Sequence, residues 1–190
     1  MDLDYITIVS GLPRSGTSMM MQALEAGGLV ILTDHVRKKD KDNPKGYYEF
    51  EPAKRTKTDS TWVGSAVGKV VKVIYRLVYD LPDNYQYRII FMNREIDEVL
   101  TSQRKMLQRS GRSGAKVGDE KLGELFTKQL SDFKSWIQSR ENFLILPVNY
   151  QDMVDSPMQQ CKKINSFLGV ELDMDAFASV VDPTLYRNRA

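Results

Sequence analysis

Residues 11–18 read Gly-Leu-Pro-Arg-Ser-Gly-Thr-Ser, and they follow the short run Tyr-Ile-Thr-Ile-Val at residues 5–9. This β-branched run is typical of a buried strand, and residues 17–25 have the composition of a helix that Gly27 would end. Glycines in the connection let successive N–H groups turn inward toward an anion, and the following helix adds the positive end of its dipole. Strand, glycine loop and helix together predict a phosphate-binding loop.

Further apolar runs extend this beginning into a sheet. Those that predict strands cover residues 29–32, 70–75, 87–92 and 143–148, and those with helical spacing cover residues 96–107, 122–137, 158–168 and 174–181. The polar segment 33–61 is expected to be mostly loop, with at most a short helix. Strands that alternate with helices favour an α/β fold, a P-loop-type three-layer domain with a central, mostly parallel sheet of about five strands and helices on both faces.

Composition limits the class of protein. The 190 residues carry a formal net charge of +2, so the totals give no case for a nucleic acid or a membrane surface as partner. The single cysteine, Cys161, allows no internal disulfide and suits a reducing compartment. No apolar run is long enough to span a bilayer, and the first run leads directly into the glycine loop, which leaves no room for a signal peptide. We expect one cytoplasmic domain spanning residues 1–190.

The loop departs from that of nucleoside triphosphatases at one position. Its spacing is that of Gly-x-x-x-x-Gly-Lys-Ser/Thr, but Thr17 stands where those enzymes carry the lysine that reaches the terminal phosphates. No predicted strand ends in an aspartate that would hold magnesium, so no metal site is predicted and metal-dependent phosphoryl transfer is disfavoured. A nucleoside or nucleotide kinase is kept as the alternative enzyme.

A second anion site is predicted after the strand at residues 87–92. Arg94 follows that strand, and Ser102 lies two turns into the next helix, where the two side chains would grip a second phosphate. In the competing interpretation, Arg94 pairs with Glu95 or Asp97 and Ser102 faces solvent.

Taken in order, these motifs resemble the sulfotransferase family, and most closely its bacterial and tyrosylprotein-type members. Residues 149–154 (Asn-Tyr-Gln-Asp-Met-Val), 167–170 (Phe-Leu-Gly-Val) and 182–189 (Asp-Pro-Thr-Leu-Tyr-Arg-Asn-Arg) are also similar to segments of that family. The resemblance implies metal-independent transfer of a sulfuryl group from 3′-phosphoadenosine 5′-phosphosulfate to a hydroxyl or amine, with adenosine 3′,5′-bisphosphate as product. The partners would be this nucleotide donor and an acceptor that the sequence does not identify.

The resemblance also implies roles for individual residues. Those that would bind the nucleotide are Arg14, Ser15, Gly16, Thr17, Ser18, Arg94, Ser102 and Tyr150. The loop residues would hold the 5′-phosphosulfate, and Arg94 with Ser102 the 3′-phosphate. Tyr150 would approach the adenine or the 3′-phosphate, unless it is simply a packed aromatic. Lys72 falls where cytosolic members place the lysine of a Lys-Thr-His segment, unless it lies at an exposed sheet edge.

The catalytic base is the point at which the family pattern breaks. The histidine of the Lys-Thr-His segment is absent, because Ile74 stands in its place. We rank Glu49 first as the base, because two preceding tyrosines would desolvate it. The competing interpretation is a carboxylate at the start of a helix or a solvated surface charge. Asp34 ranks second and His35 third, while Lys72 and Arg14 would stabilise charge on the leaving nucleotide. Without any base, the chain would be a non-catalytic nucleotide-binding protein.

Overall fold

The computed structural model describes residues 3–34, 36, 46–109, 111 and 118–185. Its centre is a five-stranded sheet in the order β2-β3-β1-β4-β5, in which neighbouring strands pair in parallel. In this spatial order the strands are β2 (Ile31–Leu32), β3 (Val70–Lys72), β1 (Tyr5–Gly11), β4 (Gln86–Asn93) and β5 (Phe143–Asn149). The predicted parallel α/β sheet is confirmed.

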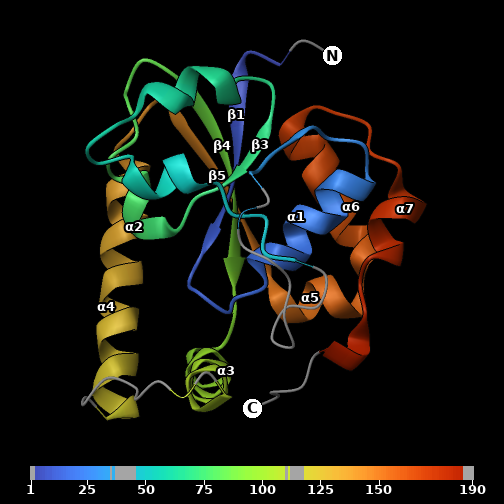
Figure 1. Cartoon of the computed structure of the whole chain (residues 1–190). Coiled ribbons are helices and arrows are strands. Elements are labelled where there is room, and N and C mark those ends of the chain that lie inside the picture. The colour runs from blue at the N-terminus through green and yellow to red at the C-terminus, as the bar shows by residue number, and fades with distance from the viewer. Residues whose placement is uncertain (1–2, 35, 37–45, 110, 112–117, 186–190) are drawn as a thin grey trace.

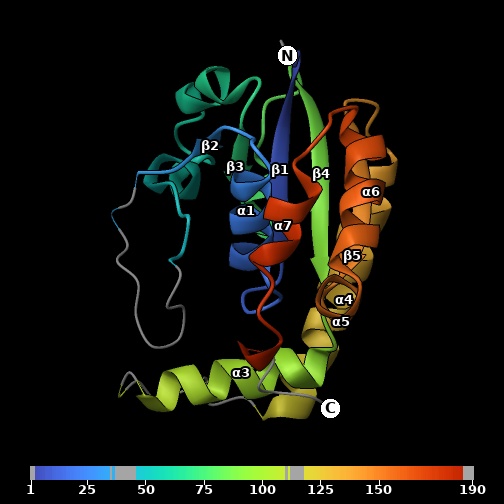
Figure 2. The same ribbon diagram turned by 90° about the vertical axis from the view of Figure 1, so that its right-hand side faces the viewer.

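Helices cover both faces of this sheet, as predicted (Figure 1). One face carries α1 (Thr17–Ala26), α5 (Tyr150–Asp155), α6 (Pro157–Leu168) and α7 (Met174–Ser179); the other carries α2 (Tyr75–Val78) and α4 (Asp119–Gln138). Helix α3 (Ile96–Arg109) lies across the carboxyl end of the strands (Figure 2). Three short 3₁₀ helices are η1 (Glu51–Arg55), η2 (Thr61–Ala66) and η3 (Pro183–Leu185). In the described part of the chain, none of the helices has both the length and the apolar character needed to cross a bilayer.

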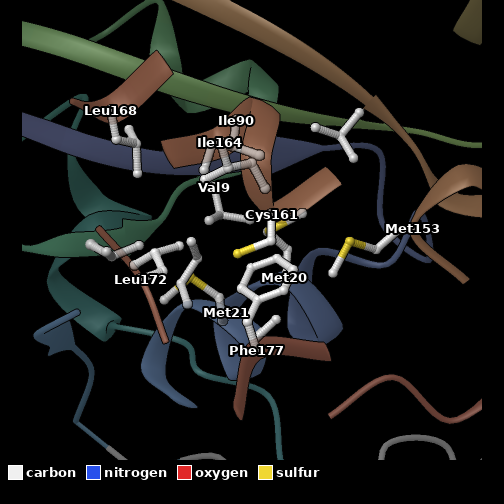
Figure 3. Close-up of a cluster of buried hydrophobic side chains, with 14 of the residues drawn as sticks. Val9, Met20, Met21, Ile90, Met153, Cys161, Ile164, Leu168, Leu172 and Phe177 are labelled. Atoms are coloured by element: carbon white, nitrogen blue, oxygen red, sulfur yellow. The ribbon is translucent and has the colours of Figure 1, made fainter. Parts of the chain in front are cut away.

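The period of two along β1 divides the core into two clusters. Val9 packs under α1, α6 and α7 (Figure 3), whereas Ile6 and Ile8 face α2 and α4. Cys161 is fully buried in the first cluster, and burial raises the pKa of its thiol. Its burial agrees with a structural thiol.

The register of the sheet brings distant loops to one place. Gly11 at the end of β1 lies opposite Met92 of β4, and Met92 lies opposite Val148 of β5. Three strands therefore end at the same level. Because the chain runs from β1 to β2 on one side and later crosses over β1 to reach β4, the loop after β1 lies at a topological switch point. Ligands of open α/β sheets bind at such points.

The structure corrects the predicted extent of one strand. The apolar run at residues 70–75 leaves the sheet after Lys72, and Tyr75 instead begins α2. The ring of Tyr75 packs edge-on against Phe133 of α4 at 5.9 Å, and its hydroxyl donates to the side chain of Gln129. Packing on α4 thus outweighs the strand propensity of the sequence. The helix α5, which directly follows β5, was not predicted.

Candidate active site

The predicted phosphate loop joins β1 to α1 through three residues with left-handed backbone angles. These are Gly11 (φ 146°), Arg14 (φ 74°) and Gly16 (φ 100°). A Cβ atom on Gly16 would lie 2.4 Å from Cδ2 of Tyr150, so only glycine lets this turn pack against that ring. The loop therefore has a fixed shape that a side chain at position 16 would destroy.

The loop also presents polar groups that the fold itself does not use. The N-cap residue of α1 is Gly16, which has no side chain that could accept a hydrogen bond from the first turn of the helix. The hydroxyl of Ser15 is buried and has no hydrogen-bond partner among the described residues. Buried hydroxyls are seldom left unsatisfied, which marks this loop as a place for a polar ligand. Thr17 and Ser18 open the helix beside it, and the set of donors fits a phosphate or a sulfate.

Arg94 lies against this loop and not in solvent. Its Nη1 donates to the carbonyl oxygen of Arg14 at 3.1 Å, and its Nε donates to Oε2 of Glu98 at 2.8 Å. Its guanidinium lies 4.4 Å from the centroid of the Tyr150 ring. Burial raises the pKa of Tyr150, although the charge of Arg94 opposes the shift. Tyr150 is thus a packed aromatic that also contacts Arg94 of the predicted second anion site.

Ser102 links the two predicted anion sites, which we call anchors: the loop with Arg14 is the first, and Arg94 with Ser102 is the second. Ser102 is 5% exposed, and its Oγ accepts a hydrogen bond from Nε of Arg14 at 3.0 Å. The expectation that Ser102 would merely face solvent is therefore wrong. The loop arginine reaches the second anchor, and the arginine of that anchor reaches the loop.

Lys72 occupies the other side of the loop. Its Nζ donates to the hydroxyl of Ser18 at 3.2 Å and to the carbonyl oxygen of Tyr47 at 3.0 Å. Strand β3 lies between β2 and β1, so Lys72 does not lie at an exposed edge of the sheet. The structure thus brings Lys72 to the N-terminus of α1, and its predicted contact with the phosphosulfate stays a prediction.

The two described candidate bases lie on the segment that borders Lys72. Glu49 is 15% exposed at its side chain and pairs with Nζ of Lys54 at 2.6 Å. The Asp34 carboxylate accepts the backbone N–H of Glu51 at 2.6 Å and that of Val36 at 3.0 Å. Although burial opposes the change, these bonds lower the pKa of Asp34. A carboxylate whose two oxygens already accept N–H groups is a weak base. The third candidate, His35, lies outside the described residues.

Asp34 gives a stability prediction. Because folding lowers its pKa, its contribution is present above the unfolded value near pH 4 and is lost as the pH falls through the lower folded value. Asp34→Asn replaces one accepting oxygen with a donor, so we expect the free energy of unfolding at pH 7 to fall by about 1 kcal/mol. Urea denaturation at pH 7 and pH 3 measures this, and the difference from wild type should narrow at pH 3. An equal difference at both pH values would contradict the prediction.

Two participants in this site were missed by the sequence analysis. Glu98 pairs with Arg94, whereas the competing interpretation had named Glu95 or Asp97. The position of Glu98 four residues after the arginine, in the first turn of a helix, was the signal that would have identified it. The carbonyl of Tyr47 accepts from Lys72. No pattern of side chains in the sequence predicts that Lys72 donates to the main-chain carbonyl of Tyr47.

Comparisons with known proteins show which family and fold this chain is similar to. The family model described as "Sulfotransferase domain" matches residues 79–188, which is more than half of the chain. This span includes Arg94, Ser102 and Tyr150 but not the phosphate loop. A search of curated proteins finds no significant match.

Solved structures share the fold at low sequence identity. The sulfotransferase domain of the Synechococcus PCC 7002 olefin synthase is 14% identical with a TM-score of 0.59, over 100% of this chain and 89% of that one. Mouse sulfotransferase SULT7A1, complexed with PAP, is 16% identical with a TM-score of 0.59, over 98% and 67%. Sulfotransferase STF1 from Mycobacterium tuberculosis is 15% identical with a TM-score of 0.61, over 94% and 71%.

Proposed function

Because this chain belongs to the sulfotransferase domain family, we propose that it transfers a sulfuryl group from 3′-phosphoadenosine 5′-phosphosulfate to a hydroxyl or amine acceptor without a metal ion. The observation that carries the proposal is the contact between the two anchors, in which Arg14 donates to Ser102 and Arg94 donates to the Arg14 carbonyl. A nucleotide with phosphates on both its 3′ and 5′ positions matches two adjacent cationic sites. We propose that the site belongs to one domain spanning residues 1–190.

The two anchors divide the nucleotide between them in this proposal. Arg14, the hydroxyl of Ser15, the N–H group of Gly16, and the hydroxyls of Thr17 and Ser18 hold the 5′-phosphosulfate. Arg94 and Ser102 hold the 3′-phosphate, and the ring of Tyr150 packs against the guanidinium group of Arg94. Two observations support the assignment of the 5′ end: the buried hydroxyl of Ser15 has no partner among the described residues, and the N-cap of α1 is a glycine without a capping side chain.

The donor supplies a sulfuryl group that is activated by its link to phosphate. Lys72 and Arg14 balance the negative charge that develops on the leaving side, since both are cations at the loop. In this proposal Glu49 accepts the proton of the acceptor. Glu49 follows Tyr47, whose carbonyl contacts Lys72, by two residues, and its carboxylate pairs with the side-chain cation of Lys54. Asp34 ranks second because two backbone N–H groups already occupy its oxygens.

A thermal-shift comparison tests the nucleotide class. At a concentration of about 100 times the dissociation constant, adenosine 3′,5′-bisphosphate adds about 2.7 kcal/mol of stability, which corresponds to a rise in Tm of roughly 5–10 °C for a chain of this size. Adenosine triphosphate with magnesium should give a much smaller shift. The reverse order would favour the kinase alternative. Binding of the bisphosphate without turnover on a broad acceptor panel would favour a non-catalytic nucleotide-binding protein.

A further inference from the structure

Glu98 is a buried acid at the centre of the second anchor. Its side chain is 4% exposed, and that of its partner Arg94 is 8% exposed. A carboxylate removed from water is costly unless a cation and hydrogen bonds compensate it. The pair is therefore part of the packed site, unlike an ion pair on a solvated surface.

The guanidinium of Arg94 is restrained from three directions. Nε donates to Glu98 at 2.8 Å, and Nη1 donates to the carbonyl of Arg14 at 3.1 Å. The Tyr150 ring lies beneath it, with 4.4 Å from the guanidinium carbon to the ring centroid. The two hydrogen bonds fix the direction in which the planar guanidinium group points, and the aromatic ring fixes the orientation of its plane.

The pairing with Glu98 is a local property of α3. Arg94 lies just before the helix, and Glu98 lies in the first turn, four residues later. This spacing places the two side chains on one face, and the positive end of the helix dipole favours a carboxylate there. Glu95 and Asp97, the partners named in the competing interpretation, are both exposed.

We infer that Glu98 is a positioning residue for recognition of the 3′-phosphate, an inference that rests on the function proposed above. Its carboxylate does not bind the phosphate, because two anions repel; it acts by holding Arg94 in one orientation. Two effects of Glu98 oppose each other. Its negative charge reduces the positive potential at the second anchor, whereas its hydrogen bond holds the guanidinium group of Arg94 in one orientation. An arginine side chain has great rotamer freedom, so ordering it before binding is the larger effect.

Calorimetry with adenosine 3′,5′-bisphosphate and adenosine 5′-phosphate measures the 3′-phosphate preference of each variant. Glu98→Ala is expected to lower that preference roughly tenfold, the effect of losing one hydrogen bond to a charged group. Glu98→Gln keeps an acceptor for Nε of Arg94 and is expected to retain most of the preference. Asp97→Asn removes one exposed negative charge from the same helical turn and is the matched control, with the wild-type preference expected.

A double-mutant cycle separates positioning from direct binding. When Arg94 is already alanine, adding Glu98→Ala should not change the preference further, because Glu98 acts through Arg94. Losses that add independently, or an unchanged or higher preference in Glu98→Ala, would overturn the inference. If the alanine variant does not fold, Glu98→Met fills a similar volume without an acceptor and carries the same expectation. A wild-type chain without any 3′-phosphate preference would instead remove the proposed function.

Discussion

Replacing both Arg94 and Ser102 with alanine should lower the preference for 3′-phosphorylated over plain adenosine nucleotides by about 10²–10⁴-fold. Each side chain is expected to donate a hydrogen bond to a charged phosphate, which contributes about 1.5–3 kcal/mol. A tenfold change in affinity corresponds to about 1.4 kcal/mol, so the two losses together give this range. The expected effect is large because both side chains are buried beside the loop.

Each single replacement is expected to have a further effect beyond the loss of its own bond to the 3′-phosphate. Arg14 donates to Ser102 and accepts from Arg94, so the three residues share contacts. Arg94→Ala should have the larger single effect, because it removes a charge and also the donor to the Arg14 carbonyl. Ser102→Ala frees the Arg14 side chain to move, which should weaken binding of both nucleotides slightly.

Isothermal titration of each variant with adenosine 3′,5′-bisphosphate and adenosine 5′-phosphate measures the preference. Arg104→Ala is the matched control: it removes one cation from the same helix, but its side chain is 54% exposed and pairs with Asp119. We expect this control to keep the wild-type preference. If Arg94→Ala also keeps it, the 3′-phosphate is bound elsewhere and the assignment of the second anchor is wrong.

Glu49→Gln is expected to lower the turnover number by about 10²–10⁴-fold while leaving nucleotide affinity nearly unchanged. General-base catalysis contributes rate factors of this order, and the amide cannot take a proton from the acceptor. The change keeps the size of the side chain and removes one negative charge next to Lys54. Turnover is measured with the best acceptor from a panel of hydroxyl and amine compounds, and affinity by calorimetry.

Lys54 also supplies the matched control for this experiment. It contacts both Glu49 and Glu51, but the side chain of Glu51 is 43% exposed, against 15% for Glu49. Glu51→Gln therefore removes the same charge from the same lysine and should change turnover by less than about twofold. An unchanged rate in Glu49→Gln would exclude Glu49 as the base, and Asp34 would be the next residue to replace.

Most of the fold was predictable because its signals are local. The strand, glycine loop and helix at residues 5–26 follow from β-branched composition, from glycines and from helical spacing, and the structure confirms them. The prediction failed at residues 73–75, where propensity favoured a strand. There the ring of Tyr75 leaves the sheet to pack against Phe133, a residue 58 positions later that no local pattern connects with it.

The sequence by itself determined that a glycine loop, predicted to bind phosphate, follows the first strand and that Arg94 follows the fourth. Only the tertiary structure decided that Arg14 meets Ser102, 88 residues away, that Glu98 is the partner of Arg94, and that Lys72 lies inside the sheet. The physical reason is the distance along the chain over which each kind of signal acts. Periodicity and propensity report neighbours within a few residues, whereas strand order and register place Gly11 beside Met92 and so bring separate loops into contact.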